Sequence, residues 1–69
     1  MNSEEVKKKI GTKLKEAREK ANLTQDQLAK KAGLSTNYYA CVERGEESIS
    51  NIRLAKLEEI LGIKIFNIK

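Results

Sequence analysis

The sequence predicts an all-α protein, a compact bundle of four or five short helices. Two observations favour this class. Apolar residues recur at steps of three and four along most of the chain, and serine, threonine and glycine stand where such helices would begin and end. The 69 residues are enough for one small core but not for two, and no repeat or linker divides them. A single domain over residues 1–69 is therefore expected.

The first helix is predicted over residues 3–21. Its apolar stripe recurs at steps of four, four, three and four: Val6, Ile10, Leu14, Ala17 and Ala21. Acidic residues in the first turn and basic residues in the last turn both suit the helix dipole. One face of this helix should pack against the rest of the chain.

The second helix is predicted over residues 25–32. Thr24 followed three positions later by Gln27 is typical of a capping box, in which each residue satisfies a backbone N–H of the other. Gly33 is suited to the left-handed conformation that ends many helices.

The third and fourth helices are predicted over residues 36–44 and 51–61. Ser35 and Ser50 precede them as N-caps, and a glycine follows each. The tail, residues 63–69, is short and apolar, and its pattern fits either a helical turn or a strand.

Composition excludes several classes of function. The chain has no histidine and one cysteine, so we expect no metal cluster, no internal disulfide and no ordinary base for a nucleophile. An enzyme, a metal site and a cofactor are therefore not expected. A lone thiol suits a reducing compartment. No apolar run is long enough to span a membrane, and residues 1–10 lack the apolar centre of a signal peptide, so we expect a cytoplasmic protein.

The positive charge lies in the N-terminal half. Of the 14 basic and 10 acidic residues, nine and five fall within residues 1–33, so this segment accounts for the whole net charge of +4. Such an excess can be a solvated helix face that keeps the protein in solution, or it can attract phosphate groups. Charge alone does not choose between the two.

A tight corner between the second and third helices is the first pointer to function. They are joined by three or four residues that include Gly33, as in a helix-turn-helix. Ala29 is small where two helices would cross closely. A shared core between the two helices can be closed by Leu28, Ala32, Tyr39 and Val42.

Across residues 9–63 this pattern resembles the repressor-type helix-turn-helix family of phage repressors, Cro proteins and controllers of restriction–modification systems. The matching elements are Thr24-Gln25, Leu28-Ala29, Gly33-Leu34, Glu43-Arg44-Gly45 and Leu61-Gly62-Ile63. The resemblance implies a lambda repressor-like fold and a sequence-specific regulator of transcription, a dimeric repressor or controller that reads a palindromic operator in double-stranded DNA.

One position departs from the family pattern. Tyr39 stands where the family usually has isoleucine or valine. We expect its ring in the core, with either its hydroxyl at the surface or a slight tilt of the third helix, because burying a bare hydroxyl is costly.

The resemblance implies that the outward face of the third helix enters the major groove. Its candidate base contacts are Thr36, Asn37, Tyr38, Ala40 and Cys41. Asn37 could pair with adenine, and Tyr38 could reach a phosphate through its hydroxyl or pack its ring against a sugar or a thymine methyl group. Structural alternatives stay open for four of them. Thr36 and Asn37 could be ordinary first-turn helix residues, and Tyr38 could be a surface aromatic. Cys41 could be a small packing residue or a redox sensor.

Other positions would hold the DNA backbone or the fold itself. The candidate phosphate contacts are Gln25, Arg44, Asn51, Lys13 and Lys30. Gln25 opens a helix, where backbone N–H groups and the helix dipole attract an anion. The resemblance further implies that Arg18 pairs with Glu43 in a structural role, partly buried, rather than in contact with DNA.

A dimer needs an interface between its two copies, called the dimer seam here, and the candidate residues for it lie at the apolar end of the chain. They are Ile60, Ile63, Ile65, Phe66 and Ile68. The alternative is that Phe66 folds back onto the core of its own domain. A second function also stays open, a protein-interaction module on the same fold such as the antitoxin of a toxin–antitoxin pair.

Overall fold

A computed structural model describes residues 2–65 of the chain, and within them it confirms the all-α class. Its helices are α1 (Ser3–Lys20), α2 (Gln25–Ala32), α3 (Thr36–Glu43) and α4 (Asn51–Leu61). α1 and α3 each end one residue before the predicted boundary, where Ala21 and Arg44 are the C-caps. No fifth helix and no strand occurs in residues 2–65, and none of the four helices is long and apolar enough to cross a membrane.

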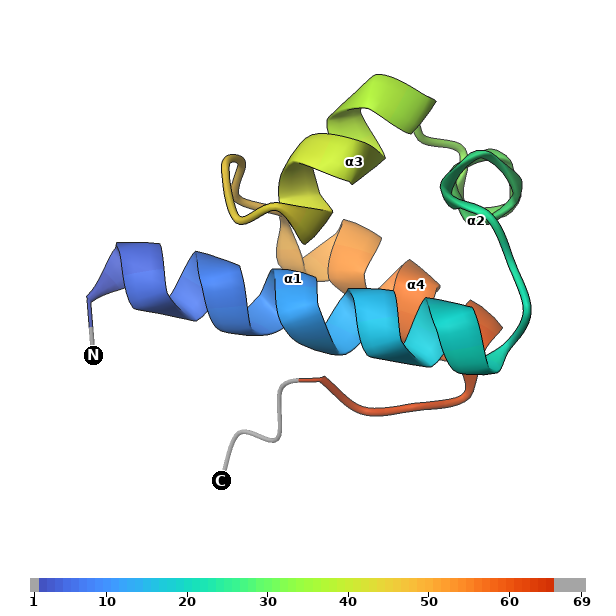
Figure 1. Ribbon diagram of the computed structural model, residues 1–69, viewed down its shortest axis with the longest axis horizontal. Coiled ribbons are helices and arrows are strands. Elements are labelled where there is room, and N and C mark those ends of the chain that lie inside the picture. Colours follow the sequence, from blue (N-terminus) through green and yellow to red (C-terminus); the bar gives the residue numbers. More distant parts are fainter. Residues whose placement is uncertain (1, 66–69) are drawn as a thin grey trace.

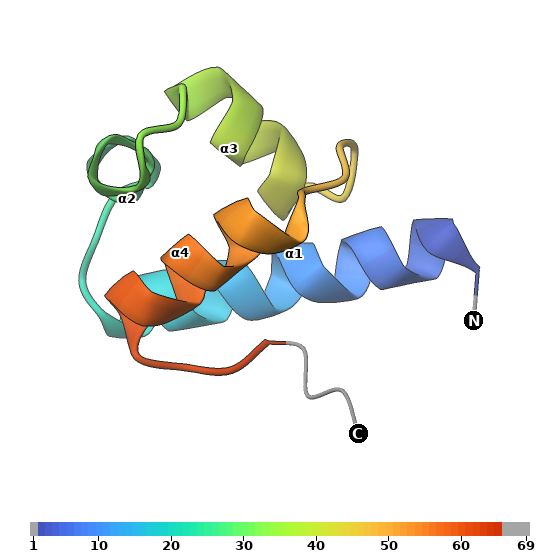
Figure 2. The same cartoon turned by 180° about the vertical axis from the view of Figure 1, so that it is seen from behind.

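The helices form two levels. α1 runs along the base, α4 crosses behind it, and α2 and α3 lie above them (Figure 1). Seen from behind, α4 lies across α1, and the chain after α4 turns back beneath the bundle (Figure 2). The closest helix pairs are α1 with α3, α2 with α3, and α2 with α4. α3 is thus held from below and from one end, while its upper face is left open.

The corner between α2 and α3 follows the predicted chemistry. Thr24 and Gln27 form the expected capping box: the Thr24 hydroxyl accepts from the Gln27 N–H at 3.0 Å, and the Thr24 N–H donates to Gln27 Oε1 at 2.9 Å. Gly33 ends α2 at φ 73°, a left-handed conformation that other residues adopt only with strain. Ser35 then caps α3 by accepting from the Tyr38 N–H at 3.0 Å. Three residues therefore suffice for the turn.

The core lies where the four helices meet. Its buried apolar residues are Ile10, Leu14, Leu28, Ala29, Tyr39, Val42, Leu54, Leu57 and Ile65. The predicted contact between α2 and α3 is present, since Leu28, Tyr39 and Val42 are buried and Ala32 packs against them at the edge. Ala29 is fully buried, as expected of a small residue between two close helices.

The closest approach between helices is at a residue with no side chain. A Cβ atom added at Gly11 of α1 would lie 2.3 Å from the carbonyl oxygen of Glu43 and 2.6 Å from that of Val42. No real side chain fits at such distances, so glycine is required where the end of α3 rests on α1. A glycine inside a helix is visible in the sequence, but its contact with α3 is not.

The tail corrects part of the predicted dimer seam. Ile65 is only 8% exposed and belongs to the core of its own domain, and its N–H donates to Glu58 Oε2 at 2.7 Å. Its assignment to a dimer interface is therefore wrong. Ile60 and Ile63 are half-buried and pack against the same core, and Phe66 and Ile68 lie outside the described residues.

Candidate nucleic-acid interface

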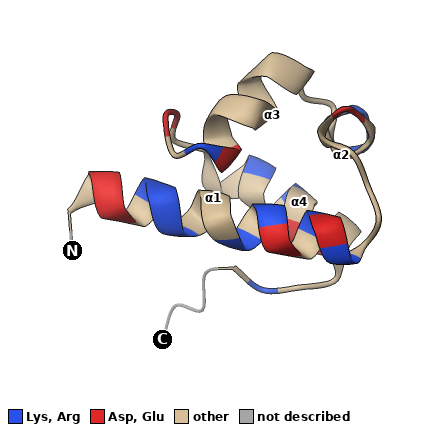
Figure 3. Ribbon diagram, viewed as in Figure 1, with Lys and Arg blue, Asp and Glu red and all other residues tan. Residues whose placement is uncertain are grey.

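The open face of α3 is polar but uncharged. Tyr39 and Val42 point into the core, whereas Asn37 is exposed and Thr36, Ala40 and Cys41 are half-exposed. In Figure 3 the ribbon of α3 carries no charged residue until its C-terminal end, in contrast to α1. Four of the five predicted base contacts thus share one accessible surface of small, neutral side chains.

Thr36, at the start of α3, is tied to α2. Its hydroxyl donates to Asp26 Oδ1 at 2.5 Å, and Lys30 Nζ lies 3.3 Å from Asp26 Oδ2. The hydrogen bond from Thr36, and then the one from Lys30, lower the pKa of Asp26 below its ordinary value. Sequence reasoning missed Asp26. The i,i+4 spacing of Asp26 and Lys30 is visible in the sequence, but the contact with Thr36 across the turn is not.

Tyr38 is more involved in the fold than predicted. Its hydroxyl donates to the carbonyl oxygen of Ser48 at 2.8 Å, and the Arg53 guanidinium lies 5.4 Å from the centre of its ring. In the free protein the hydroxyl proton is therefore used within the chain, which favours the predicted contact through the ring over the one through the hydroxyl. The ring also joins α3 to the loop before α4 and to Arg53, a cation that sequence reasoning left out.

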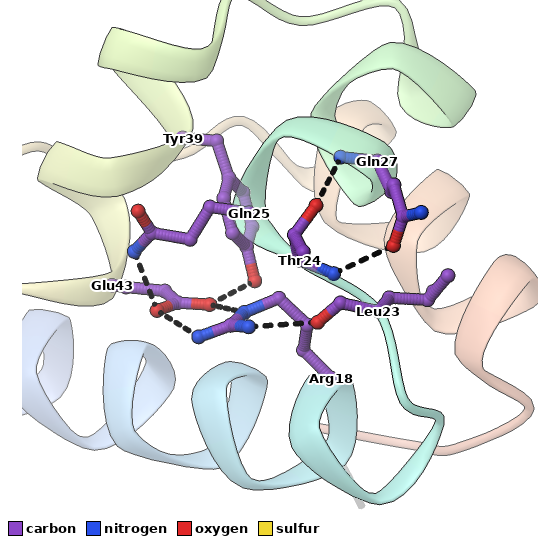
Figure 4. Close-up of polar contacts among 7 residues, drawn as sticks. All are labelled: Arg18, Leu23, Thr24, Gln25, Gln27, Tyr39 and Glu43. Carbon is purple, nitrogen blue, oxygen red and sulfur yellow. Dashed lines mark hydrogen bonds and ion pairs between the residues drawn. The ribbon is translucent and has the colours of Figure 1, made fainter.

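Behind α3, three side chains donate hydrogen bonds to the carboxylate of Glu43 (Figure 4). Arg18 Nε donates to Glu43 Oε2 at 2.7 Å and Arg18 Nη2 to Oε1 at 3.3 Å. Gln25 Nε2 donates to Oε1 at 2.9 Å, and the Tyr39 hydroxyl donates to Oε2 at 2.5 Å. Arg18 Nη1 also donates to the carbonyl oxygen of Leu23 at 2.8 Å. The Glu43 cluster, which we define as Arg18, Gln25, Tyr39 and Glu43, therefore joins α1, α2 and α3.

Burial and hydrogen bonding set the charge state of this cluster. The side chains of Arg18 and Glu43 are 11% and 3% exposed. Burial raises the pKa of Glu43, but hydrogen bonds from Arg18, Tyr39 and Gln25 outweigh it, and the pKa ends below its usual range. Burial and the hydrogen bond to Glu43 raise the pKa of Tyr39 far above its ordinary value. A neutral tyrosine thus donates to an ionised carboxylate.

The cluster corrects the expectation for Tyr39. Its ring lies in the core as predicted, but its hydroxyl is buried as well and reaches Glu43 instead of the surface. The cluster also engages Gln25, a predicted phosphate contact. Gln25 Nε2 carries two hydrogens and gives one to Glu43, so one remains for another acceptor.

The predicted phosphate contacts do not all lie on this side of the molecule. Arg44 lies at the end of α3 and pairs with Glu46 through Nε at 3.0 Å and Nη2 at 3.1 Å, with both side chains more than half exposed. Its Nη2 is also 3.4 Å from Cys41 Sγ. Asn51 is exposed at the start of α4, beyond the Ser50 N-cap. Arg44 thus lies at the C-terminal end of α3, and Asn51 on a different helix.

Lys13 is placed differently. It lines a hollow between α1 and the tail, together with Leu61 and Ile63. The lysine of α1 that borders α2 and α3 is Lys15, which shares a hollow with Gln25, Glu43 and Arg44. Lys15 is therefore a further candidate for a phosphate contact, and the contact predicted for Lys13 stays a prediction. The helical spacing of Lys15 from Arg18 is the signal that could have identified it.

A sequence profile of the family described as Helix-turn-helix matches residues 14–66. The chain belongs to the helix-turn-helix family. It is 36% identical over 62 residues to control protein C.MunI of a Mycoplasma species, a match that covers 88% of this chain and 84% of the relative. It is 39% identical over 56 residues to the immunity repressor protein of Bacillus phage phi105, covering 81% of this chain but 39% of that protein.

A solved helix-turn-helix protein has the same fold. The restriction-modification controller protein C.AhdI from Aeromonas hydrophila superposes with a TM-score of 0.85 and 32% sequence identity, over 94% of each chain. The predicted family resemblance is confirmed. Within this helix-turn-helix chain, α2 and α3 are the two helices of the motif, and α3 is the one whose outer face is open. Residues 2–65 hold no group of three or more His, Cys, Asp or Glu side chains that could bind a metal ion.

Proposed function

We propose that this protein is a sequence-specific, double-stranded DNA-binding regulator of transcription that places α3 in the major groove. The observation that carries the proposal is the open, neutral and polar face of α3. Arg44 lies at the C-terminal end of this helix, and Lys15 of α1 shares a hollow with Arg44 and Gln25. A helix with small outward side chains can approach base edges closely. The similarity to two controllers and a phage repressor supports the same function. A cytoplasmic location is part of the proposal.

Base reading would fall to the first half of α3. The exposed amide of Asn37 suits bidentate pairing with adenine N6 and N7. Ala40 keeps the helix near the base edges, and Cys41 offers a small apolar surface to a thymine methyl group. Tyr38 would contribute its ring, since its hydroxyl is bound to Ser48.

Phosphate binding would use groups around this face. Gln25 would give its second Nε2 hydrogen to a phosphate while the first stays on Glu43, so that the Glu43 cluster orients it. The other proposed phosphate contacts are Lys15, Lys30, Arg44 and Asn51. Arg44 is paired with Glu46 in the free protein, and a phosphate would compete with that carboxylate. Lys30 has three donor hydrogens, so it would contact a phosphate while it stays beside Asp26.

The decisive experiment is a selection of bound duplexes from a pool of random DNA. A regulator should enrich one motif, and a dimer should enrich it as two symmetry-related half-sites about one helical turn apart. Substituting Asn37 by alanine should relax the preference at one position of each half-site and leave the others unchanged. If no motif is enriched, the open face of α3 is not a DNA-reading surface, and the protein-interaction function becomes the better explanation.

Arg44→Ala is expected to weaken binding to all DNA sequences alike and to reduce the slope of log affinity against log salt by about one unit, because one phosphate contact is lost. Glu46→Gln should have the opposite effect on affinity, since it removes the carboxylate that now holds the guanidinium. Titrations of the operator and of an unrelated duplex at several salt concentrations measure both. A loss confined to the operator would show that Arg44 reads bases instead.

A dimer is the second part of the proposal, because one small module makes few phosphate contacts. With Ile65 in the core, the large apolar side chain that is most exposed within residues 2–65 is Ile52 on the outer side of α4, at 84%. Ala55 lies one turn along the same helix and is exposed too. We propose that this side of α4 contributes to the seam, with the half-buried Ile60 and Ile63 at its edge.

Ile52→Glu is therefore expected to shift the protein from dimer to monomer in analytical ultracentrifugation without DNA, since two like charges would meet across a two-fold contact. The variant should still be folded and show a cooperative thermal unfolding transition, because this side chain is outside the core. Ile52→Leu is the matched control and should stay dimeric. A wild-type protein that is monomeric at all concentrations tested would exclude this seam.

A further inference from the structure

The first residue of α3 gives its hydroxyl proton to a carboxylate of α2. Thr36 Oγ1 and Asp26 Oδ1 are 2.5 Å apart. The pKa of Asp26 is below its ordinary value because of hydrogen bonds from Thr36 and Lys30, so the carboxylate is ionised at neutral pH. An ionised carboxylate can only accept, which makes Thr36 the donor. The single hydroxyl proton of Thr36 is thus committed inside the protein.

What remains of the Thr36 hydroxyl is an acceptor. A free threonine hydroxyl can donate to or accept from any base edge, and for that reason discriminates poorly. Once its proton is held by Asp26, the oxygen can only accept. In the major groove, adenine and cytosine present amino donors at N6 and N4, whereas guanine and thymine present carbonyl acceptors at O6 and O4. The Thr36 oxygen and the carbonyl oxygen of guanine or thymine repel each other, because both are hydrogen-bond acceptors. The negative charge of Asp26 adds to this repulsion.

We propose that Asp26 is a specificity-determining residue that acts through Thr36: by holding the Thr36 proton, it makes this residue select a base with an amino group and reject a base with a carbonyl group. The inference rests on the proposed function, because it needs α3 in the major groove. At one base of each half-site, adenine or cytosine would be accepted and guanine or thymine rejected. Thr36 alone would not sort bases in this way.

Lys30 explains how an acid is tolerated so near the DNA. An unpaired carboxylate close to phosphates would weaken binding to every sequence. Lys30 Nζ lies 3.3 Å from Asp26 Oδ2, the oxygen that does not hold Thr36. One carboxylate oxygen thus orients the hydroxyl and the other is balanced by a cation. The Asp26–Lys30 pair is mostly exposed, with side chains 55% and 76% accessible, so stability does not account for it.

The test is the random-DNA selection repeated with the wild type and with Asp26→Ala. The wild type should deplete guanine and thymine roughly tenfold at one position of each half-site, in line with the usual cost of one mismatch. In Asp26→Ala the Thr36 hydroxyl can rotate to donate or accept, so the depletion should fall to within about twofold at that position only. Glu4→Ala is the matched control: it removes an exposed carboxylate that is likewise paired with a lysine of its own helix, Lys7 of α1, and should leave the base preference unchanged.

Two substitutions of Thr36 complete the test. Thr36→Ser keeps the hydroxyl and should keep the amino preference, and Thr36→Val removes it and should lose the preference. Persistence of the preference in Thr36→Val, or an equal change at every position in Asp26→Ala, would overturn the inference. A wild-type motif without an amino-against-carbonyl preference would overturn this inference alone, whereas a wild type that enriches no motif would overturn the proposed function with it.

Discussion

Arg18→Met is expected to lower the free energy of unfolding by about 3–5 kcal/mol, the usual cost of removing one partner from a buried ion pair. The substitution leaves the Glu43 carboxylate, 3% exposed, with hydrogen bonds from Gln25 and Tyr39 but without a cation. It also removes the donor to the carbonyl of Leu23 at the end of α1. Denaturant unfolding of the purified variant measures the loss.

The double variant decides whether the two residues act as a pair. Glu43→Leu alone strands the Arg18 guanidinium and a buried tyrosine hydroxyl, so it too should be strongly destabilised. Arg18→Met with Glu43→Leu leaves no stranded charge and should lose less than the sum of the single losses. Arg44→Met is the control, since its pair with Glu46 is exposed and should contribute little. Small and additive losses at Arg18 and Glu43 would contradict a structural role for the pair.

The same cluster should make the protein sensitive to acid. Because the pKa of Glu43 is lowered in the folded state, its contribution to stability is present above the ordinary glutamate range and is lost as the pH falls through the folded value. Glu43→Gln, which cannot ionise, should lower stability at neutral pH and flatten this part of the pH profile. A wild-type profile as flat as that of Glu43→Gln would show that the carboxylate is not stabilised by its partners.

Gly11→Ala is the second substitution with a large expected effect, a loss of about 3 kcal/mol, at the upper end for overpacking. Alanine is the better helix former by about 1 kcal/mol, which offsets part of the clash. The added methyl group would lie 2.3 Å and 2.6 Å from two carbonyl oxygens of α3, and backbone atoms cannot rotate away as a side chain can. α1 and α3 would have to separate, and the Arg18–Glu43 contact lies between the same two helices. Thermal and denaturant melts measure the change.

Gly33→Ala is the matched control for this prediction. Gly33 has a positive φ of 73°, but a Cβ there would meet nothing within 4 Å. The loss should therefore be about 1 kcal/mol, the strain of a left-handed residue without a clash. If Gly11→Ala is as mild as Gly33→Ala, then the two helices are not held at the distance seen here.

Much of this molecule could be predicted from local patterns. Caps, glycine stops and apolar spacing located every helix to within about one residue, because these signals act within one or two turns of the chain. The same signals placed Tyr39 and Val42 inward and so identified the open face of α3. The family pattern added the Arg18 and Glu43 positions, which do lie in contact.

The sequence by itself determined the helices, their inner faces and the family to which the chain belongs, because these depend on neighbouring residues. Only the tertiary structure decided what the polar groups do. In the folded chain the Tyr39 hydroxyl has a buried acceptor, and Thr36 donates its hydroxyl proton to Asp26. Arg44 pairs with Glu46, and Ile65 packs into the core of its own domain. Two of these contacts are local, the Arg44–Glu46 pair and the Tyr39–Glu43 hydrogen bond within α3. The contact of Thr36 with Asp26 and the packing of Ile65 join different elements, and their geometry depends on how those elements pack. A hydrogen bond needs its two atoms within a few tenths of an ångström, and one-dimensional spacing does not carry that precision.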